Sequence, residues 1–215
     1  MKKVILVDGN NLLFRSYYAT AYQGNFMKNS KGFPTNALYG FVNMINKIIN
    51  DEKPEYMLVA FDKGKTFRHD KYEDYKAGRI EMPNELKQQF PVAKEILTNL
   101  GIKWFEIDNY EADDIVGTLS KMIDDCDDYR GLIVSSDKDL LQLITDKVIM
   151  KMLKPKDYVM MTKETFFDVY GLTPEKMIDI KALQGDSSDN IPGVKGIGEK
   201  TALKLLQEYG SFEPL

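Results

Sequence analysis

Apolar residues gather along the chain in two kinds of run. Short, nearly continuous apolar runs indicate buried strands, and they occur at residues 4–7, 57–61, 103–107, 132–135 and 148–152. Longer segments, at residues 37–49 and 115–123, carry apolar residues at the spacing of one helical face. Strands that alternate with helices favour an α/β fold with a mostly parallel central sheet flanked by helices.

Residues 84–100 are helical in composition, with Pro91 expected to break or kink the helix. After about Thr162 the pattern changes to short helices and tight turns. Further on, Thr173-Pro174 predicts a helix start and Gly185 its end, and a glycine-rich turn precedes a last helix at 199–209. We therefore expect an α/β core at 1–161 and a helix-hairpin-helix region at 162–215.

Three of the predicted strands run into an aspartate, namely Asp8, Asp62 and Asp137. In an open α/β sheet, ligands lie beyond the carboxyl ends of the strands, so these side chains are expected to converge. A single such aspartate is commonly a cap or turn residue. Three of them together favour a functional site.

Six further carboxylates belong to this candidate cluster: Glu111, Asp113, Asp114, Asp139, Asp186 and Asp189. Helix capping explains one or two acids in the 111–114 segment, and turn formation remains an alternative for the last two. Crowded carboxylates repel one another unless cations bind between them. Oxygen ligands select Mg²⁺ or Mn²⁺ rather than zinc, and two such ions about 4 Å apart could bind a phosphate and activate water.

The bulk composition agrees with this hypothesis. The net charge is −4, but nine acidic charges belong to the cluster, so the rest of the chain is net positive. One cysteine, Cys126, and one histidine, His69, argue against disulfides, a thiolate zinc site and Ser-His-Asp chemistry. No apolar stretch is long enough to span a bilayer. A reducing cytoplasm is the expected location.

Residues 63–90 combine seven Lys or Arg residues with four aromatic residues, directly after Asp62. Cations there would lie over the acidic site and meet a phosphate backbone, although a solvated helical face is the plain alternative. Tyr75, Lys76 and Arg79 are the strongest candidates. On a helix, the last two lie three residues apart and would point from one face toward the metals.

The glycine-rich turn at residues 191–202 indicates contact between backbone N–H groups and a phosphate. Two rival phosphate motifs fit poorly. Lys63-Gly64-Lys65-Thr66 lacks the earlier glycine of a P-loop, because Val59 occupies that position. A phosphatase-type nucleophile at Asp8 would need a second acid where Asn10 stands.

These motifs, taken in order, resemble the 5′-nuclease (flap endonuclease) domain at the N-terminus of bacterial DNA polymerase I. The resemblance rests on Val7-Asp8-Gly9-Asn10, Phe61-Asp62, Tyr75-Lys76-Ala77-Gly78-Arg79, Tyr110-Glu111-Ala112-Asp113-Asp114, Ser136-Asp137-Lys138-Asp139 and the segment from Gln184 to Gly193. It implies a structure-specific 5′-3′ exonuclease that threads or clamps a 5′ end beneath a helical arch, here at about residues 63–90, and removes flaps and RNA primers.

The resemblance also implies roles for individual residues. Asp8, Asp62, Glu111 and Asp113 would hold one metal ion, and Asp113, Asp137, Asp139 and Asp189 the second, with Asp114 and Asp186 in support. Lys76 would contact the scissile phosphate, and a K⁺ ion is expected at the hairpin. DNA contacts are expected at Arg15, Tyr75, Lys76, Arg79, Lys181, Gly193, Lys195, Gly196, Gly198, Lys200 and Thr201.

Two other functions remain open from the sequence: a DNA-structure-binding module that does not cut, and a small RNA-cleaving nuclease. Against the first, a binder gains nothing from concentrated negative charge near phosphates; the second would not need the glycine-rich turn. Family domains continue beyond the equivalent of Leu215, so the chain is expected to be either a cut piece of a longer polymerase or a short stand-alone nuclease. It is expected to be monomeric, with a fused or associated polymerase region as partner.

Overall fold

The computed structural model describes residues 1–21, 27–155 and 157–211. Its centre is a six-stranded sheet in the order β3-β2-β1-β4-β5-β6. The strands are β1 (Lys2–Asp8), β2 (Tyr56–Ala60), β3 (Lys103–Phe105), β4 (Tyr129–Ser135), β5 (Val148–Leu153) and β6 (Tyr158–Met161). All neighbours pair in parallel except β5 and β6, which are antiparallel. The predicted α/β class with a mostly parallel sheet is therefore confirmed.

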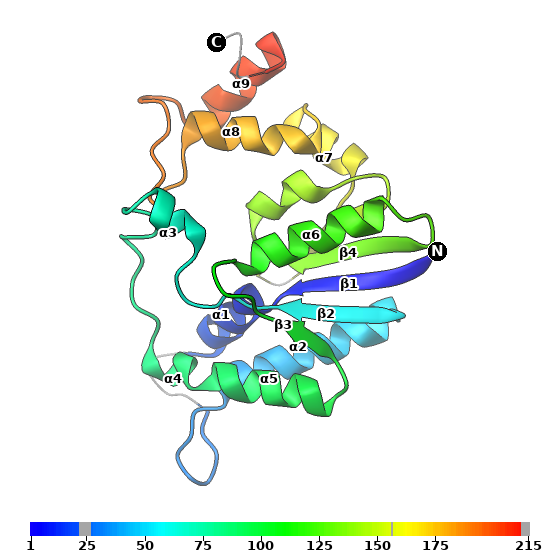
Figure 1. The fold of residues 1–215 in the computed structure, drawn as a ribbon, viewed down its shortest axis with the longest axis vertical. Helices are drawn as coiled ribbons and strands as arrows, with labels where there is room; N and C mark the ends of the chain where they lie inside the picture. Colours follow the sequence, from blue (N-terminus) through cyan, green and yellow to red (C-terminus); the bar gives the residue numbers. More distant parts are fainter. Residues whose placement is uncertain (22–26, 156, 212–215) are drawn as a thin grey trace.

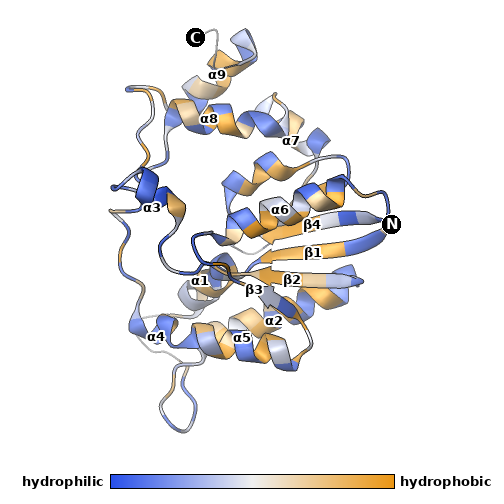
Figure 2. Ribbon diagram, in the orientation of Figure 1, coloured by the Kyte–Doolittle hydropathy of each residue, from blue (hydrophilic) through white to orange (hydrophobic). Residues whose placement is uncertain are grey.

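Helices cover both faces of the sheet (Figure 1). One hydrophobic cluster joins the sheet to α1 (Gly9–Thr20), α2 (Asn36–Glu52) and α5 (Gln89–Asn99). A second cluster joins the other face to α6 (Ala112–Asp124), the 3-10 helix η2 (Lys138–Leu143) and α7 (Lys163–Tyr170). Strands β1, β2 and β4 are apolar toward their carboxyl ends, as Figure 2 shows, and there the two clusters cover both of their faces.

The C-terminal helical region shares this second cluster. The 3-10 helix η3 (Pro174–Lys176) and α8 (Met177–Gln184) follow Thr173, and α8 ends at Gly185, whose φ is 72°. Helix α9 (Glu199–Tyr209) comes after the glycine-rich turn. The predicted start, stop and last helix are confirmed. The division at 161/162 stays a prediction, and residues 212–215 of its second part lie outside the described chain.

One strand was not predicted from the sequence: β6 is an edge strand of only four residues, the first two of them exposed. The predicted break in the helical segment 84–100 is present. Two helices, α4 (Asn84–Lys87) and α5, are separated at Gln88, and Pro91 lies within the first turn of α5. There the missing N–H of proline has no intrahelical partner to lose, so Pro91 is compatible with the helix start.

The segment at 63–90 crosses the carboxyl ends of the strands (Figure 1). It contains only two short helices, α3 (Phe67–Lys71) and α4, and residues 72–83 between them are turns and irregular backbone. Lys76 has a positive φ of 60°, which no residue of a right-handed helix adopts. The expectation that Lys76 and Arg79 share a helical face is therefore wrong. No helix in the described part of the chain is long and apolar enough to cross a membrane.

Candidate active site

The strand-terminal aspartates lie together at one edge of the sheet. Asp8 is the last residue of β1 and caps α1 by accepting a hydrogen bond from the Asn11 N–H at 2.9 Å. Asp62 follows β2, and Asp137 follows β4 and caps η2. Because β1 lies between β2 and β4, three strand ends bring these side chains to the same place.

A cavity of about 250 Å³ opens at this edge. Seven of the nine predicted carboxylates line it, together with two cations of the 63–90 segment: Asp8, Asp62, Glu111, Asp113, Asp137, Asp139, Asp189, Lys76 and Arg79. Glu111 and Asp113 reach it because Glu111 caps α6 and Asp113 lies in its first turn. The structure thus brings together acids from separate segments of the chain.

Burial and mutual repulsion perturb these acids. Burial, opposed in part by hydrogen bonds from Asn11 and Ser135, raises the pKa of Asp8 to about 7. Burial, reinforced by Asp8, Asp137, Asp62 and Glu111, raises the pKa of Asp113 to about 8. Negative charge crowded into a buried site is the condition that a bound divalent cation relieves.

Cations of the chain itself neutralise part of the cluster. Lys76 Nζ lies 2.6 Å from Glu111 Oε1, and Arg79 pairs with Asp189. Lys181 Nζ lies 2.6 Å from both Asp139 and Asp186. No three acidic, His or Cys side chains of residues 1–21, 27–155 and 157–211 stand in a ready metal-binding arrangement.

The donor set nevertheless fits divalent cations. Its ligands are carboxylate oxygens, which Mg²⁺ and Mn²⁺ prefer. The buried Oδ1 of Asp139 accepts no well-directed hydrogen bond within the described chain, although Lys181 Nζ is close to it. A metal ion would give this oxygen a partner, and would exchange with Lys76, Arg79 and Lys181 at the paired acids.

Asp114 and Asp186 lie outside the cavity lining and have other partners. Asp114 accepts two hydrogen bonds from Arg68, at 2.7 and 2.9 Å, and one from the Glu111 N–H. Burial would raise the pKa of Asp114, but Arg68 outweighs it and lowers this pKa. Burial is likewise outweighed at Asp186, where Lys181 and Ser188 lower the pKa to about 2. Their contribution as supporting acids remains a prediction.

Several residues that position the acids were not predicted from the sequence. Asn10 donates to Asp62 Oδ2 at 2.8 Å and accepts from the Asp62 N–H at 3.1 Å. Asn11 Oδ1 accepts from the Ser136 N–H and hydroxyl, and Ser135 Oγ donates to Asp8 Oδ2 at 2.9 Å. The only indication in the sequence was that each of these residues lies within three positions of Asp8 or Asp137.

The glycine-rich turn lies on the side of the molecule where α3 lies (Figure 1). Lys195 on the turn, and Lys200 and Thr201 at the start of α9, are exposed. Gly196 and Gly198 have open space where a Cβ would stand, so close approach of a phosphate is sterically possible. Gly193 has a different reason to be glycine, because a Cβ there would collide with the backbone of Gln184 and Gly185.

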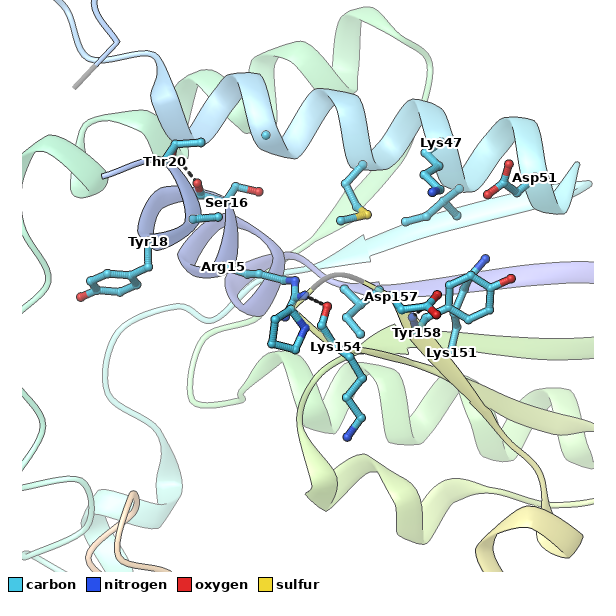
Figure 3. A pocket seen from close by; sticks show the side chains of 16 residues that line it. Arg15, Ser16, Tyr18, Thr20, Lys47, Asp51, Lys151, Lys154, Asp157 and Tyr158 are labelled. Atoms are coloured by element: carbon cyan, nitrogen blue, oxygen red, sulfur yellow. Dashed lines mark hydrogen bonds between the residues drawn. The ribbon is translucent and has the colours of Figure 1, made fainter. Parts of the chain in front are cut away.

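Besides Tyr75, Lys76 and Arg79, two further predicted DNA contacts, Lys181 and Arg15, have partners within the protein. The ammonium of Lys181 lies among acids, as described above. Arg15 donates to the Lys154 carbonyl and lines a second cavity, of about 690 Å³, between α1, α2 and the β5–β6 hairpin (Figure 3). Lys47, Lys151 and Lys154 also line this cavity, as do Asp51 and Asp157. Arg15 thus belongs to a cavity separate from the acidic one, with four cations and two carboxylates in its lining.

We expect the stability of the metal-free protein to fall as pH rises from about 4 to 8. The folded-state pKa values of Asp8 and Asp113 are raised, so the folded state binds these protons more tightly than the unfolded state. That stabilisation is complete below their ordinary pKa of about 4 and is lost as pH passes about 7 to 8. Divalent cations should reverse the loss by neutralising the acids. Differential scanning calorimetry with EDTA or Mg²⁺ measures both effects, and a flat metal-free Tm across this range would contradict them.

Comparison with known proteins agrees with this geometry. Two family models cover the chain: a 5′-3′ exonuclease N-terminal resolvase-like domain at residues 3–171, and a 5′-3′ exonuclease C-terminal SAM fold at residues 172–215. The chain is 48% identical to DNA polymerase I of Bacillus subtilis, over all of this chain but only 24% of that protein. It is also 47% identical to the 5′-3′ exonuclease of the same organism, over 99% of this chain and 72% of that protein.

Solved structures give the same result. Bacteriophage T5 5′-exonuclease with bound zinc superposes with a TM-score of 0.76 at 27% identity, covering 98% of this chain and 76% of that one. Bacteriophage T5 flap endonuclease, in a pseudo-enzyme–product complex with DNA and metal ions, superposes with a TM-score of 0.75 at 26% identity, covering 99% and 77%. Divalent metal ions therefore occur in structural relatives, and the choice of Mg²⁺ or Mn²⁺ over zinc stays a prediction.

The family models together span residues 3–215, and the site has its acids at the ends of parallel strands. The chain spans about a quarter of the DNA polymerases that it matches and most of the shorter exonuclease. The chain belongs to the 5′-3′ exonuclease family and is a nuclease of the DNA polymerase I type.

Proposed function

We propose that this chain hydrolyses phosphodiester bonds at 5′ ends, flaps and RNA primers of DNA with the help of two divalent metal ions. The single observation that supports this most is the cavity at the carboxyl ends of β1, β2 and β4, lined by seven carboxylates below Lys76 and Arg79. Acids alone would repel a phosphate. Acids with bound metal ions, faced by two cations, would attract one.

We infer the following division of roles. Asp8, Asp62, Glu111 and Asp113 would hold one ion, and Asp113, Asp137, Asp139 and Asp189 the second, with Mg²⁺ or Mn²⁺ preferred for oxygen ligands. The ions, when bound, supply water activation and stabilisation of the leaving oxygen. Asn10 and Ser135 hold the carboxylates of Asp62 and Asp8 in place through the hydrogen bonds described above.

The cations of the 63–90 segment act on the substrate. Lys76 and Arg79 are ion-paired with Glu111 and Asp189. Metal ions at those acids would free both cations to meet the phosphate between the metals and the segment. In this role they stabilise negative charge that develops as the bond breaks.

Duplex DNA would bind at the glycine-rich turn and the start of α9, through backbone N–H groups and Lys195, Lys200 and Thr201. Such contacts are independent of sequence and position the substrate without reading it. A K⁺ ion bound by backbone carbonyls of the turn would add a positive charge where the turn meets the phosphates of the duplex. A polymerase region, fused or associated, is the proposed partner, and a cytoplasmic location suits an enzyme of DNA replication and repair.

The two alternatives are less well supported. A module that binds DNA structures without cutting has no need for raised-pKa carboxylates in a cavity. A small RNA-cleaving nuclease has no need for the exposed glycine-rich turn. Both can be separated from the proposal by one set of assays.

We expect Mg²⁺ or Mn²⁺ to support cleavage of a 5′-flap DNA, and Ca²⁺ to support binding with little turnover. Ca²⁺ is larger and its coordination is looser, so the phosphate would be held in a poorer geometry. Cleavage of labelled flap DNA, of the same strand in RNA, and binding by fluorescence anisotropy measure these properties. Undiminished cleavage in excess EDTA would contradict the metal mechanism, binding without any cleavage would support the module, and a preference for the RNA strand alone would support the third function.

We expect Arg15→Ala and Lys47→Ala to weaken DNA binding and to make its salt dependence shallower, while leaving the rate of the chemical step unchanged. Both side chains line the cavity of Figure 3, which is separate from the acidic cavity of the strand ends. Removing one cation that binds a phosphate lowers the slope of log K against log salt by about one. Anisotropy titrations at several salt concentrations test this, with Lys121→Ala as the matched control, since Lys121 is exposed and pairs with Asp125. An unchanged slope would exclude this cavity as a phosphate-binding surface.

A further inference from the structure

Two loops of the protein are joined directly above the acidic cavity. One is the 74–79 loop, which carries Lys76 and Arg79, and the other is the 186–191 loop, which carries Asp186 and Asp189. The Lys76 N–H donates to the Asp189 carbonyl at 2.9 Å, and the Asn190 side-chain Nδ2 donates to the Asp74 carbonyl at 2.9 Å. These two hydrogen bonds run in opposite directions between the loops.

Side chains add to this contact. Arg79 Nε donates to the Ser188 carbonyl at 3.2 Å, and its guanidinium pairs with Asp189. The Tyr75 hydroxyl lies 3.1 Å from Glu111 Oε2 and 3.0 Å from Asp189 Oδ2, and its single hydrogen can be donated to one of them at a time. The loops are thus connected through both backbone and side-chain groups, although Tyr75 and Asp189 are 114 positions apart in sequence.

Backbone conformation marks the same place. Lys76 and Asn190 have φ values of 60° and 57°, two of only four non-glycine residues in the described chain with positive φ. Asparagine tolerates this left-handed region, whereas lysine adopts it at an energetic cost. Lys76 therefore keeps its conformation only because its surroundings impose it. Two turn hydrogen bonds within the loop, from the Ala77 N–H to the Asp74 carbonyl and from the Arg79 N–H to the Lys76 carbonyl, hold part of this backbone. The hydrogen bonds to the 186–191 loop fasten it to the rest of the protein.

We propose that Asn190 is a positioning residue for Lys76. By fastening the Asp74 carbonyl, Asn190 fixes the backbone two residues before the lysine, and the Asp189 carbonyl fixes the Lys76 N–H itself. The ammonium then reaches over the acids and lies 2.6 Å from Glu111 Oε1. Asn190 is outside the lining of the acidic cavity and needs no contact with substrate. This inference rests on the proposed role of Lys76 at the scissile phosphate.

Asn190→Gly is the direct test, because glycine adopts the same backbone conformation and lacks only the amide donor. We expect its single-turnover cleavage at saturating enzyme to be between about tenfold and a hundredfold slower, with DNA affinity within about threefold of wild type. In metal-free protein, hydrogen exchange at the Lys76 amide should be accelerated by about tenfold or more, and exchange at the Phe61 amide, bonded to Phe105, should not change.

Asn190→Asp is the second variant. It keeps the shape of the side chain, and its carboxylate would face the Asp74 carbonyl without a hydrogen to donate, so its defect should equal or exceed that of Asn190→Gly. Ser187→Ala is the matched control, because Ser187 is exposed in the same loop and lies outside the lining of the acidic cavity. Its cleavage and exchange should equal those of wild type.

A double-mutant cycle separates positioning from a general structural role. In a Lys76→Ala background, Asn190→Gly should slow cleavage by less than about threefold, since its effect acts through a lysine that is no longer present. Equal slowing in both backgrounds, or an Asn190→Gly enzyme as fast as wild type, would overturn the proposal. Failure of the wild-type enzyme to cleave flap DNA with Mg²⁺ would instead overturn the proposed function, and the exchange measurement would still report on the loop contact.

Discussion

Replacing Asp113 with asparagine is expected to abolish detectable cleavage, a loss of about a thousandfold or more. The resemblance assigns this carboxylate to both metal ions, and its position in the first turn of α6 places it in the cavity beside Asp8, Asp62 and Asp137. Loss of one shared ligand would remove several kcal/mol of stabilisation at the reacting phosphate, and each 1.4 kcal/mol corresponds to about tenfold in rate.

DNA binding by Asp113→Asn should stay intact or become tighter, because one repulsive negative charge near the phosphate is removed. Folding should also improve in the absence of metal at pH 8.5, since the raised pKa of Asp113 reports an unfavourable charged form. Single-turnover cleavage, anisotropy and Tm on the same preparation test the three statements. Asp186→Asn is the comparison, with a milder expected defect. Parallel loss of binding, cleavage and Tm would indicate misfolding, and a worse defect in Asp186→Asn would reverse the assigned roles.

Lys76→Ala is expected to slow single-turnover cleavage by about a hundredfold or more while weakening DNA binding only a few-fold. The Lys76 ammonium lies 2.6 Å from Glu111 Oε1 at the acidic cavity, and the Lys76 side chain is only 16% exposed. A cation aimed at charge that develops in the transition state contributes about 3 kcal/mol. An ordinary surface lysine would instead affect affinity and its salt dependence, with no effect on the chemical step.

The rate at saturating enzyme decides between these two roles for Lys76. Lys71→Ala is a suitable control from the same segment, because Lys71 lies on α3 outside the acidic cavity. An unchanged rate for Lys76→Ala under saturation would make Lys76 part of a basic face only. Lys76→Arg should retain part of the activity, since the charge is kept and its geometry is altered.

The sequence alone predicted the fold class and the identity of most of the acids. Apolar runs that end in Asp8, Asp62 and Asp137 define parallel strands, and ligands gather beyond the carboxyl ends of such strands. The spacing of Glu111 and Asp113 at a helix start is equally local. These features depend on neighbours within a few residues, which is the range over which sequence patterns are informative.

Only the tertiary structure showed what holds each acid and each cation. Lys76 and Arg79 reach the cavity from an irregular loop, because they are hydrogen-bonded to residues more than a hundred positions away. Lys181, expected to contact DNA, is placed between two carboxylates when α8 packs beside η2. Asn10, which follows β1, positions Asp62, which follows the neighbouring strand β2. Pairings of this kind are set by the packing of distant segments, and no local pattern of residues specifies them.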